Sequence, residues 1–287
     1  MMVQRDKAEA AHHPGAALRS RRFATPFRYM LNNLREWIEV VLRKPTETLP
    51  RLSAGSIVAV LIVLAAIIAL MFFVDAAATD WARGLPASFT NAFEEITNFG
   101  LSGWFLIPFG IALLCLAALA SPGVPKMTRG VLDALAARLG FLFLAIGAPG
   151  LFDTIVKRLI GRARPYVGTH DDPFAYRPFV WQPEYASMPS GHATTAAAAA
   201  IAIGAIWPKS RPVMWLYALI IMFSRVVVIA HHPSDVLGGA LVGGLGAWLV
   251  VRWFAARRLV FSAHDLRAFP GASLKRTIAA LHAAFRA

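Results

Sequence analysis

The stretch IVAVLIVLAAIIALMFFV, residues 57–74, contains no charged side chain and lies between Arg51 and Asp75. A helix that crosses the hydrocarbon core of a bilayer needs about 20 apolar residues, with a range of about 17–25, so this run can span a membrane. The rest of the chain agrees, because 57% of its 287 residues are hydrophobic and only 16% are charged. Soluble domains carry roughly 25% charged residues, so a soluble globular enzyme is excluded.

Five further apolar segments follow, at roughly residues 104–120, 139–156, 193–207, 213–223 and 236–254. The segments at 193–207 and 213–223 are short, and they qualify as spans only if protein rather than lipid covers their polar ends. Because backbone groups in lipid must be hydrogen-bonded within the segment, all six are expected to be helices. The predicted fold is all-α, a six-helix transmembrane bundle over residues 53–255.

Small residues in two of these segments predict close packing between helices. The segment 236–254 contains Gly239 and Gly243, a pair at a spacing that lets helix backbones approach each other. The segment 193–207 contains an uninterrupted run of alanines. We expect both features to serve packing inside the bundle rather than dimerisation.

The regions outside the bundle are basic. Residues 1–25 are predicted to be disordered. Residues 26–52 are predicted to form an amphipathic cytoplasmic interfacial helix, because apolar residues recur every three or four positions over 27–42. Packing of this helix on a partner protein is the alternative. Residues 256–287 are predicted to be a cytoplasmic basic tail.

The distribution of Lys and Arg predicts the topology. The net charge is +13, and residues 1–51 are densely basic, whereas Arg83 is the only basic residue between the first two apolar segments. By the positive-inside rule both termini are cytoplasmic, in a protein integral to a membrane and expected in a bacterial inner membrane. The basic residues are expected to interact with the lipid bilayer, and nucleic acid is not expected as a partner. Two features break this pattern: the basic connection between the third and fourth segments, and Arg225. Their positive charge therefore needs another explanation.

That connection opens with the cluster KRLIGRARP, residues 157–165. Lys157 and Arg164 are seven residues apart, so they share a face if the helix continues until Pro165 ends it near Arg164. The pair could bind one phosphate, since arginine grips two oxygens and lysine adds a compact charge. Cations that extend toward the edge of the membrane are the alternative.

The same connection closes with Pro189-Ser190-Gly191-His192, directly before the alanine-rich segment. Ser190 is a candidate helix N-cap, and Gly191 allows a ligand to approach the backbone. The N-terminus of a helix attracts anions, and His192 can donate or accept a proton. Taken alone, this motif also fits an ordinary capped helix.

A third cluster runs from Ser224-Arg225 to His231, His232 and Asp235. An arginine inside an apolar run is costly and marks a candidate functional site. Asp235 lies four residues after His231, so on a helix or turn its carboxylate can hydrogen-bond one imidazole nitrogen and leave the other free to attack. His232 is the rival nucleophile, and a metal-binding His-His-Asp cluster is the alternative site. The three clusters together supply cations, imidazoles and a helix N-terminus, which suit a phosphate bound without a metal or other cofactor.

The three motifs resemble the signature of the type-2 phosphatidic acid phosphatases, members of the vanadium haloperoxidase-like superfamily. That signature is Lys-x6-Arg-Pro, Pro-Ser-Gly-His and Ser-Arg-x5-His-x3-Asp, and this sequence fits it without departure over residues 157–235. The resemblance implies that His231 is the nucleophile that forms a phosphohistidine, that Asp235 orients it, and that His192 is the general acid and then the base. The phosphate-binding residues that it implies are Lys157, Arg164, Ser190, Gly191 and Arg225.

The resemblance implies metal-independent hydrolysis of a phosphate monoester or diphosphate on a membrane lipid, at the periplasmic face. Polyprenyl diphosphate, phosphatidate, phosphatidylglycerophosphate and lipid A are the candidate substrates. We expect selection among them in residues 166–188 and in the loop around residues 81–100. A lipid phosphotransferase that uses the same phosphohistidine is the first alternative, and a transporter or scaffold that only binds anionic lipid is the second. The sequence leaves the oligomeric state open.

Overall fold

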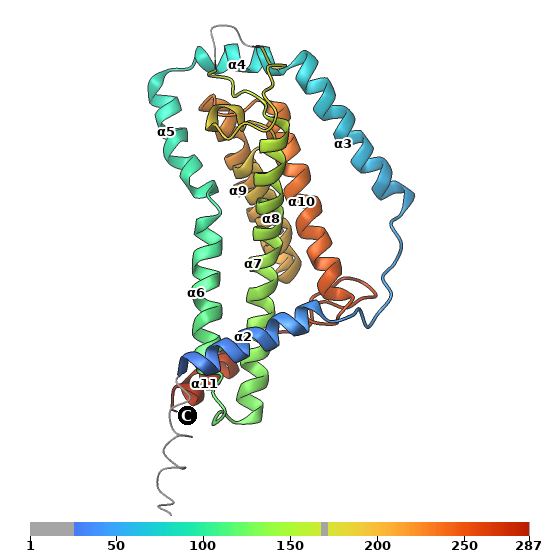
Figure 1. Ribbon diagram of the computed structural model, residues 1–287, viewed down its shortest axis with the longest axis vertical. Coiled ribbons are helices and arrows are strands. Elements are labelled where there is room, and N and C mark those ends of the chain that lie inside the picture. The colour runs from blue at the N-terminus through green and yellow to red at the C-terminus, as the bar shows by residue number, and fades with distance from the viewer. Residues whose placement is uncertain (1–25, 168–171, 287) are drawn as a thin grey trace, which may run out of the picture.

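The computed structural model describes residues 26–167 and 172–286 (Figure 1). Across these residues the regular structure is helical, with two isolated β-bridges and no strand. The predicted disordered segment 1–25 lies outside the described residues. The all-α fold is therefore confirmed for the part of the chain that the structure describes.

The helices reproduce the predicted membrane bundle. Five stretches are long and apolar enough to cross a membrane: α3 (Ala54–Phe73), α5 with α6 (Ala87–Leu119), α7 (Lys126–Ile160), Pro208–Val227, which contains α9 (Arg211–Val227), and α10 (Pro233–Ala255). The sixth apolar helix, α8 (Gly191–Ile206), has 16 residues and is shorter than a full span. Most of its residues are buried by protein, which meets the condition under which so short a segment could qualify as a span.

α8 is the centre of the bundle, and α7, α9 and α10 surround it. Its alanine run is buried, with side chains small enough for these neighbours to pack closely. A Cβ atom on Gly239 would lie 2.3 Å from the Ser190 carbonyl oxygen, and one on Gly243 would lie 2.1 Å from that of Thr194. The glycines of α10 thus let it touch the backbone of α8, which confirms the predicted role of both small-residue runs in internal packing.

Two helices cross the end of the bundle that lies opposite α4 (Asp75–Arg83): α2 (Pro26–Leu42) and α11 (Leu274–Phe285) (Figure 1). The amide of Asn33, buried on α2, donates at 2.8 Å to the carbonyl oxygens of Ala117 and Ala120, which end α6 (Gly103–Leu119). Because α2 ends at Leu42, the segment predicted over 26–52 is helical only in its first part.

The connection between the first two apolar segments differs from the expected loop around residues 81–100. It contains α4 and α5 (Ala87–Thr97), followed by a 3-10 turn at Asn98–Gly100. Phe89 and Phe93 lie one helical turn apart on α5, and Phe93 meets Phe223 of α9 edge-on at 5.5 Å between ring centroids. This apolar contact stabilises a helix where the sequence suggested a loop.

The end of α7 also differs from the prediction. The helix stops at Ile160, four residues before Arg164, because Gly161 adopts a left-handed conformation with φ of 64°. Glycine is the usual residue at such a helix end. A Cβ at this position would also lie 1.9 Å from the carbonyl oxygen of Arg177. Lys157 is therefore helical, whereas Arg164 lies in the following loop, and the two do not share a helical face.

Candidate active site

The three motifs meet at one end of the bundle, the end that carries α4 (Figure 1). Lys157 lies in the last turn of α7, Gly191 and His192 begin α8, and Arg225 lies in the last turn of α9. The pair His231-His232 directly precedes α10. The helix ends thus bring together residues that are far apart in the sequence.

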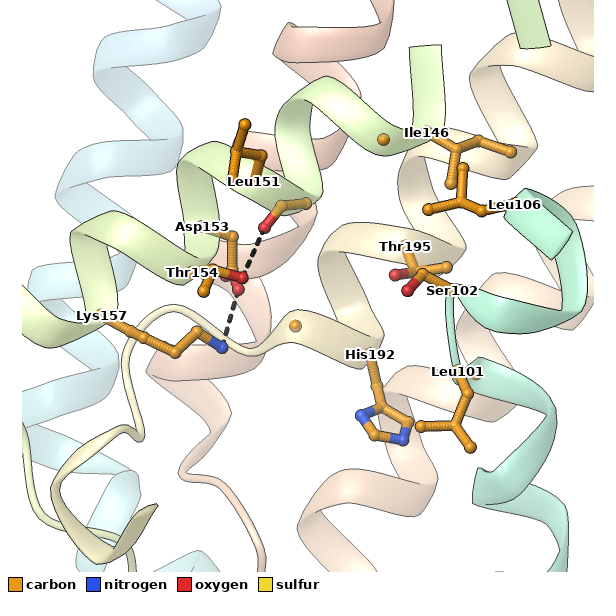
Figure 2. Close-up of a pocket in the computed structure, with 14 residues that line it drawn as sticks. Leu101, Ser102, Leu106, Ile146, Leu151, Asp153, Thr154, Lys157, His192 and Thr195 are labelled. Atoms are coloured by element: carbon orange, nitrogen blue, oxygen red, sulfur yellow. Dashed lines mark hydrogen bonds and ion pairs between the residues drawn. The ribbon is translucent and has the colours of Figure 1, made fainter. Parts of the chain in front are cut away.

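A cavity of about 410 Å³ lies between α6, α7 and the start of α8 (Figure 2). Figure 2 shows Lys157 reaching this cavity from α7 and His192 reaching it from α8. Leu101, just before α6, and apolar residues of α6 and α7 form much of the remaining wall, among them Leu106, Ile146 and Leu151. A polar group with an attached apolar chain matches this combination of walls.

Lys157 is held in place by a buried carboxylate. Its Nζ lies 2.7 Å from Oδ2 of Asp153, one helical turn earlier, and Oδ1 of Asp153 accepts a hydrogen bond of 3.1 Å from the Thr194 hydroxyl. A Cβ on Gly191 would lie 3.2 Å from the Lys157 Nζ. The missing side chain at Gly191 therefore lets the ammonium group approach the start of α8, as a shared anion site requires.

Three of the site residues that the resemblance implies have a buried polar atom with no hydrogen-bond partner in the described structure: Oγ of Ser190, Nε of Arg225 and Nδ1 of His231. Leaving a buried polar atom unpaired costs about 1–3 kcal/mol, so each such atom in a folded protein needs an explanation, such as a catalytic role or a bound ion. Ser190 Oγ and Arg225 Nε can both donate to an anion. The rest of the Arg225 guanidinium is fixed, because its Nη1 donates to the Thr97 hydroxyl at 2.7 Å.

Arg164 joins these groups from the loop. Its backbone N–H donates to the Glu184 carbonyl at 2.8 Å, and its Nε donates to that of Pro183 at 3.1 Å. Its charge and that of Arg225 act on both His231 and His192, and the charge of Lys157 also acts on His192. The structure thus brings together the two histidines and the three cations that the sequence singled out.

The environment of His231 keeps it neutral. Burial lowers the pKa of His231 to about 4, and the charges of Arg225 and Arg164 act in the same direction, against the opposing effect of Asp235. A neutral imidazole has the free nitrogen lone pair that nucleophilic attack requires. At neutral pH His231 is therefore in the unprotonated form that its predicted role as nucleophile requires.

We expect a carbon NMR titration of histidine-labelled protein to show the His231 ring protonating with a midpoint near pH 4 instead of the ordinary 6.5. Because the folded-state pKa is lowered, the nucleophilic form dominates above pH 4 and is lost as the pH falls through it. The His231→Gln variant assigns the resonance. A midpoint near 6.5 would contradict the burial of this ring among cations.

Asp235 is fully buried but does not hydrogen-bond His231 here. Its Oδ2 lies 3.9 Å from the His231 Nδ1, which is longer than a hydrogen bond. That oxygen instead accepts from the Ser187 hydroxyl at 2.6 Å and from the His232 backbone N–H at 2.9 Å. The orienting role of Asp235 stays a prediction.

Ser190 fulfils only part of its predicted capping role, and the role of His232 stays open. Ser190 occupies the N-cap position of α8, but its hydroxyl makes no capping hydrogen bond. His232, the rival nucleophile, is buried, and its Nδ1 lies 3.4 Å from the Thr79 hydroxyl of α4. Over the described ranges, no group of three or more His, Cys, Asp and Glu side chains could hold a metal ion.

Four buried residues of this region were missed by the sequence reasoning: Asp75, Thr97, Asp153 and Arg162. Asp153 had a usable signal, because an acidic residue inside an apolar run is as unusual as Arg225. Asp75, at the end of the first apolar segment, carried the same signal in a weaker form. Arg162 carried no such signal, because it lies with Arg164 in one basic cluster and the sequence does not distinguish the two. Only the fold shows that Arg162 is enclosed by carboxylates, whereas Arg164 acts on the histidines.

This chain is similar to several known phosphatases. A lipid A 1-phosphatase of Rhizobium etli is 35% identical over 178 residues, which cover 61% of this chain and 76% of that protein. A decaprenylphosphoryl-5-phosphoribose phosphatase of Mycobacterium tuberculosis is 34% identical over 133 residues, covering 46% of this chain and 66% of that protein. The crystal structure of a transmembrane PAP2 type phosphatidylglycerolphosphate phosphatase from Bacillus subtilis matches with a TM-score of 0.46 at 20% identity, over 67% of this chain and 93% of that one.

The family assignment rests on the extent of these sequence matches. Residues 138–259 match the model of the PAP2 superfamily, and this range contains all three motifs. The Rhizobium relative is matched over most of its own length. The chain belongs to the PAP2 superfamily, as a membrane-embedded member.

Proposed function

We propose that this protein removes a phosphate group from a membrane lipid through a phosphohistidine on His231, without a metal ion. The observation that carries the proposal is the set of buried, unpaired polar atoms on Ser190, Arg225 and His231. A tetrahedral phosphate beside His231 would give the two donors their partners, and its charge would be balanced by the surrounding cations.

The proposed reaction has two displacements. In the first, Nε2 of His231 attacks the phosphorus atom, the bond to the lipid oxygen breaks, and His192 donates a proton to that oxygen. In the second, His192 accepts a proton from water as the water oxygen attacks phosphorus and the N–P bond breaks. Lys157, Arg164 and Arg225 hold the phosphate oxygens throughout, together with Ser190 and the backbone of Gly191.

The phosphate of a lipid A-type glycolipid is the first candidate substrate, because the Rhizobium relative is a lipid A 1-phosphatase. Polyprenyl diphosphate, phosphatidate and phosphatidylglycerophosphate are the further candidate substrates. All share the phosphate that the motifs are proposed to bind. We further propose that the site faces the periplasm and that α2 and α11 lie at the cytoplasmic side, as the charge distribution predicts.

A transfer reaction is the second candidate function. If a lipid hydroxyl replaced water in the second step, the same phosphohistidine would pass its phosphate to another lipid. The open, partly apolar cavity beside His192 could admit either acceptor. The two functions differ in whether inorganic phosphate appears.

The test is phosphate release by the purified full chain in detergent, with excess EDTA, from each candidate lipid in turn. We expect phosphate to be released from at least one lipid, at the same rate with and without the chelator. The reason is that His231 is proposed to attack the phosphate and the cations to bind it without a metal ion. Activity that EDTA abolishes and Mg²⁺ or Zn²⁺ restores would overturn the metal-free mechanism. Labelled lipid product without free phosphate would favour the transferase.

A further inference from the structure

A second group of buried charges lies beside the active site, centred on Arg162. Its Nη2 lies 2.8 Å from Oδ2 of Asp75, and its Nη1 lies 2.6 Å from Oδ1 of Asp235, with all three side chains fully buried. The arginine therefore bridges two carboxylates that would otherwise repel each other. We refer to Asp75, Arg162, Ser234 and Asp235 as the Arg162 cluster.

The remaining hydrogen-bonding groups of the cluster are also used. Arg162 donates from Nε to the Pro173 carbonyl at 2.9 Å and from Nη1 to the Ser234 hydroxyl at 2.6 Å. Asp75 accepts the Ser234 backbone N–H at 3.0 Å. Burial disfavours the charge of Arg162, but the carboxylates of Asp235 and Asp75 outweigh it, so the pKa of Arg162 is raised. A buried ion pair holds its geometry when its hydrogen bonds are satisfied in this way.

The cluster joins parts of the fold that are far apart in the sequence. Asp75 is the first residue of α4, directly after α3, and Ile67 is the only buried residue of α3. Arg162 follows the left-handed Gly161, and Ser234 and Asp235 lie in the first turn of α10. The first membrane helix is therefore connected, through buried charges, to the turn that carries His231.

The cluster also helps to fix the orientation of Asp235 beside His231, together with the Ser187 hydroxyl and the His232 backbone N–H that bond its Oδ2. Because Oδ1 is paired with Arg162, Oδ2 is left on the side of His231, at 3.9 Å from its Nδ1. Without Arg162, Asp75 and Asp235 would be two unbalanced buried carboxylates, and the Asp235 side chain could rotate or take up a proton.

We propose that Arg162 and Asp75 are positioning residues of the phosphatase reaction, which hold Asp235 and thereby the His231 ring in the orientation for attack. Neither residue lines the cavity shared by Lys157 and His192. They act through Asp235, not on the substrate. This inference rests on the proposed function for the reaction that it serves.

The experiment compares three conservative variants on the best lipid substrate. Arg162→Lys keeps the charge but cannot bridge both carboxylates, and Asp75→Asn keeps the shape but loses the charge. The matched control is Arg129→Lys at the opposite end of the bundle, where Arg129 bonds Asn33 and the Ala120 carbonyl. Small misplacements of reacting groups can cost about 100-fold, so we expect kcat to fall about 100-fold in Arg162→Lys and about 10-fold in Asp75→Asn.

The same variants are expected to keep KM within about twofold, since the phosphate ligands are untouched. Arg129→Lys is expected to lower the midpoint of thermal unfolding and to leave kcat at the wild-type value. If Arg162→Lys and Asp75→Asn keep kcat within twofold of the wild type, the positioning role is overturned, whatever their stability. If either protein fails to fold, Ser234→Ala, which removes only the bridging hydroxyl, gives the same comparison.

A second readout separates this inference from the proposed function. The His231 ring resonance of labelled protein is expected to shift in Asp75→Asn and Arg162→Lys, and to stay unchanged in Arg129→Lys. This measurement needs no turnover, so it tests the coupling even if the wild type releases no phosphate. A His231 resonance that is identical in all four proteins would overturn the inference.

Discussion

Replacement of His231 by alanine is expected to lower kcat by about 10⁴-fold or more, since removing the nucleophile of a covalent mechanism has effects of that order. The physical reason is that His231 is a buried, neutral imidazole beside Arg164 and Arg225, whereas the Nδ1 of its rival His232 lies 3.4 Å from the Thr79 hydroxyl. The measurement is phosphate release under single-turnover conditions, in which a slow first displacement is seen directly.

The control for this variant is His264→Ala, which removes an exposed histidine in the segment after α10. It is expected to leave kcat unchanged. Acid-labile, base-stable labelling of the protein by a ³²P-lipid should occur in the wild type and be absent in His231→Ala. Labelling that persists in His231→Ala and disappears in His232→Ala would instead make His232 the nucleophile.

The largest expected effect on stability comes from Gly243→Ala. The added Cβ would lie 2.1 Å from the Thr194 carbonyl oxygen, a backbone atom that moves only if α8 moves. Overpacking of a tight interface costs about 1–3 kcal/mol, and we expect the free energy of unfolding to fall by about 3 kcal/mol here. The measurement is unfolding of the detergent-solubilised protein by heat or by SDS, followed by circular dichroism.

Gly244→Ala is the matched control, because it makes the same change at the next residue, where a Cβ would meet nothing within 4 Å. Its stability is expected to stay within about 1 kcal/mol of the wild type, the usual difference between glycine and alanine in a helix. Equal destabilisation by both variants would show that α8 and α10 are not in close contact. Gly243→Ala is also expected to reduce activity, since Thr194 hydrogen-bonds the Asp153 that holds Lys157.

Much of this fold could be predicted because lipid imposes simple requirements. The run at residues 57–74 has to be a helix of roughly the length that α3 has. The alanine run and Gly239 and Gly243 predicted close contacts, because only small side chains allow them. The three motifs predicted which residues would meet, since their spacing matches one family signature.

The features that could not be predicted depend on contacts between distant residues. The end of α7 is determined by Gly161, whose φ and closeness to Arg177 follow from how the loop folds back. The helix α5 forms where a loop was expected because Phe93 has a partner on α9. The bridging role of Arg162 needs Asp75 and Asp235 on two other helices, and no local pattern marks it.

The central position of α8 has a consequence for how the protein is made. The translocon meets α8 as a 16-residue, alanine-rich segment, shorter than the roughly 20 apolar residues that partition into a bilayer unaided. Its stable place in the membrane depends on α9 and α10, which are synthesised after it and pack against it. We therefore expect α8 to be the last span that inserts stably in the membrane. A partly inserted chain would then lack the proposed phosphate site and could not act on lipids before its assembly is complete.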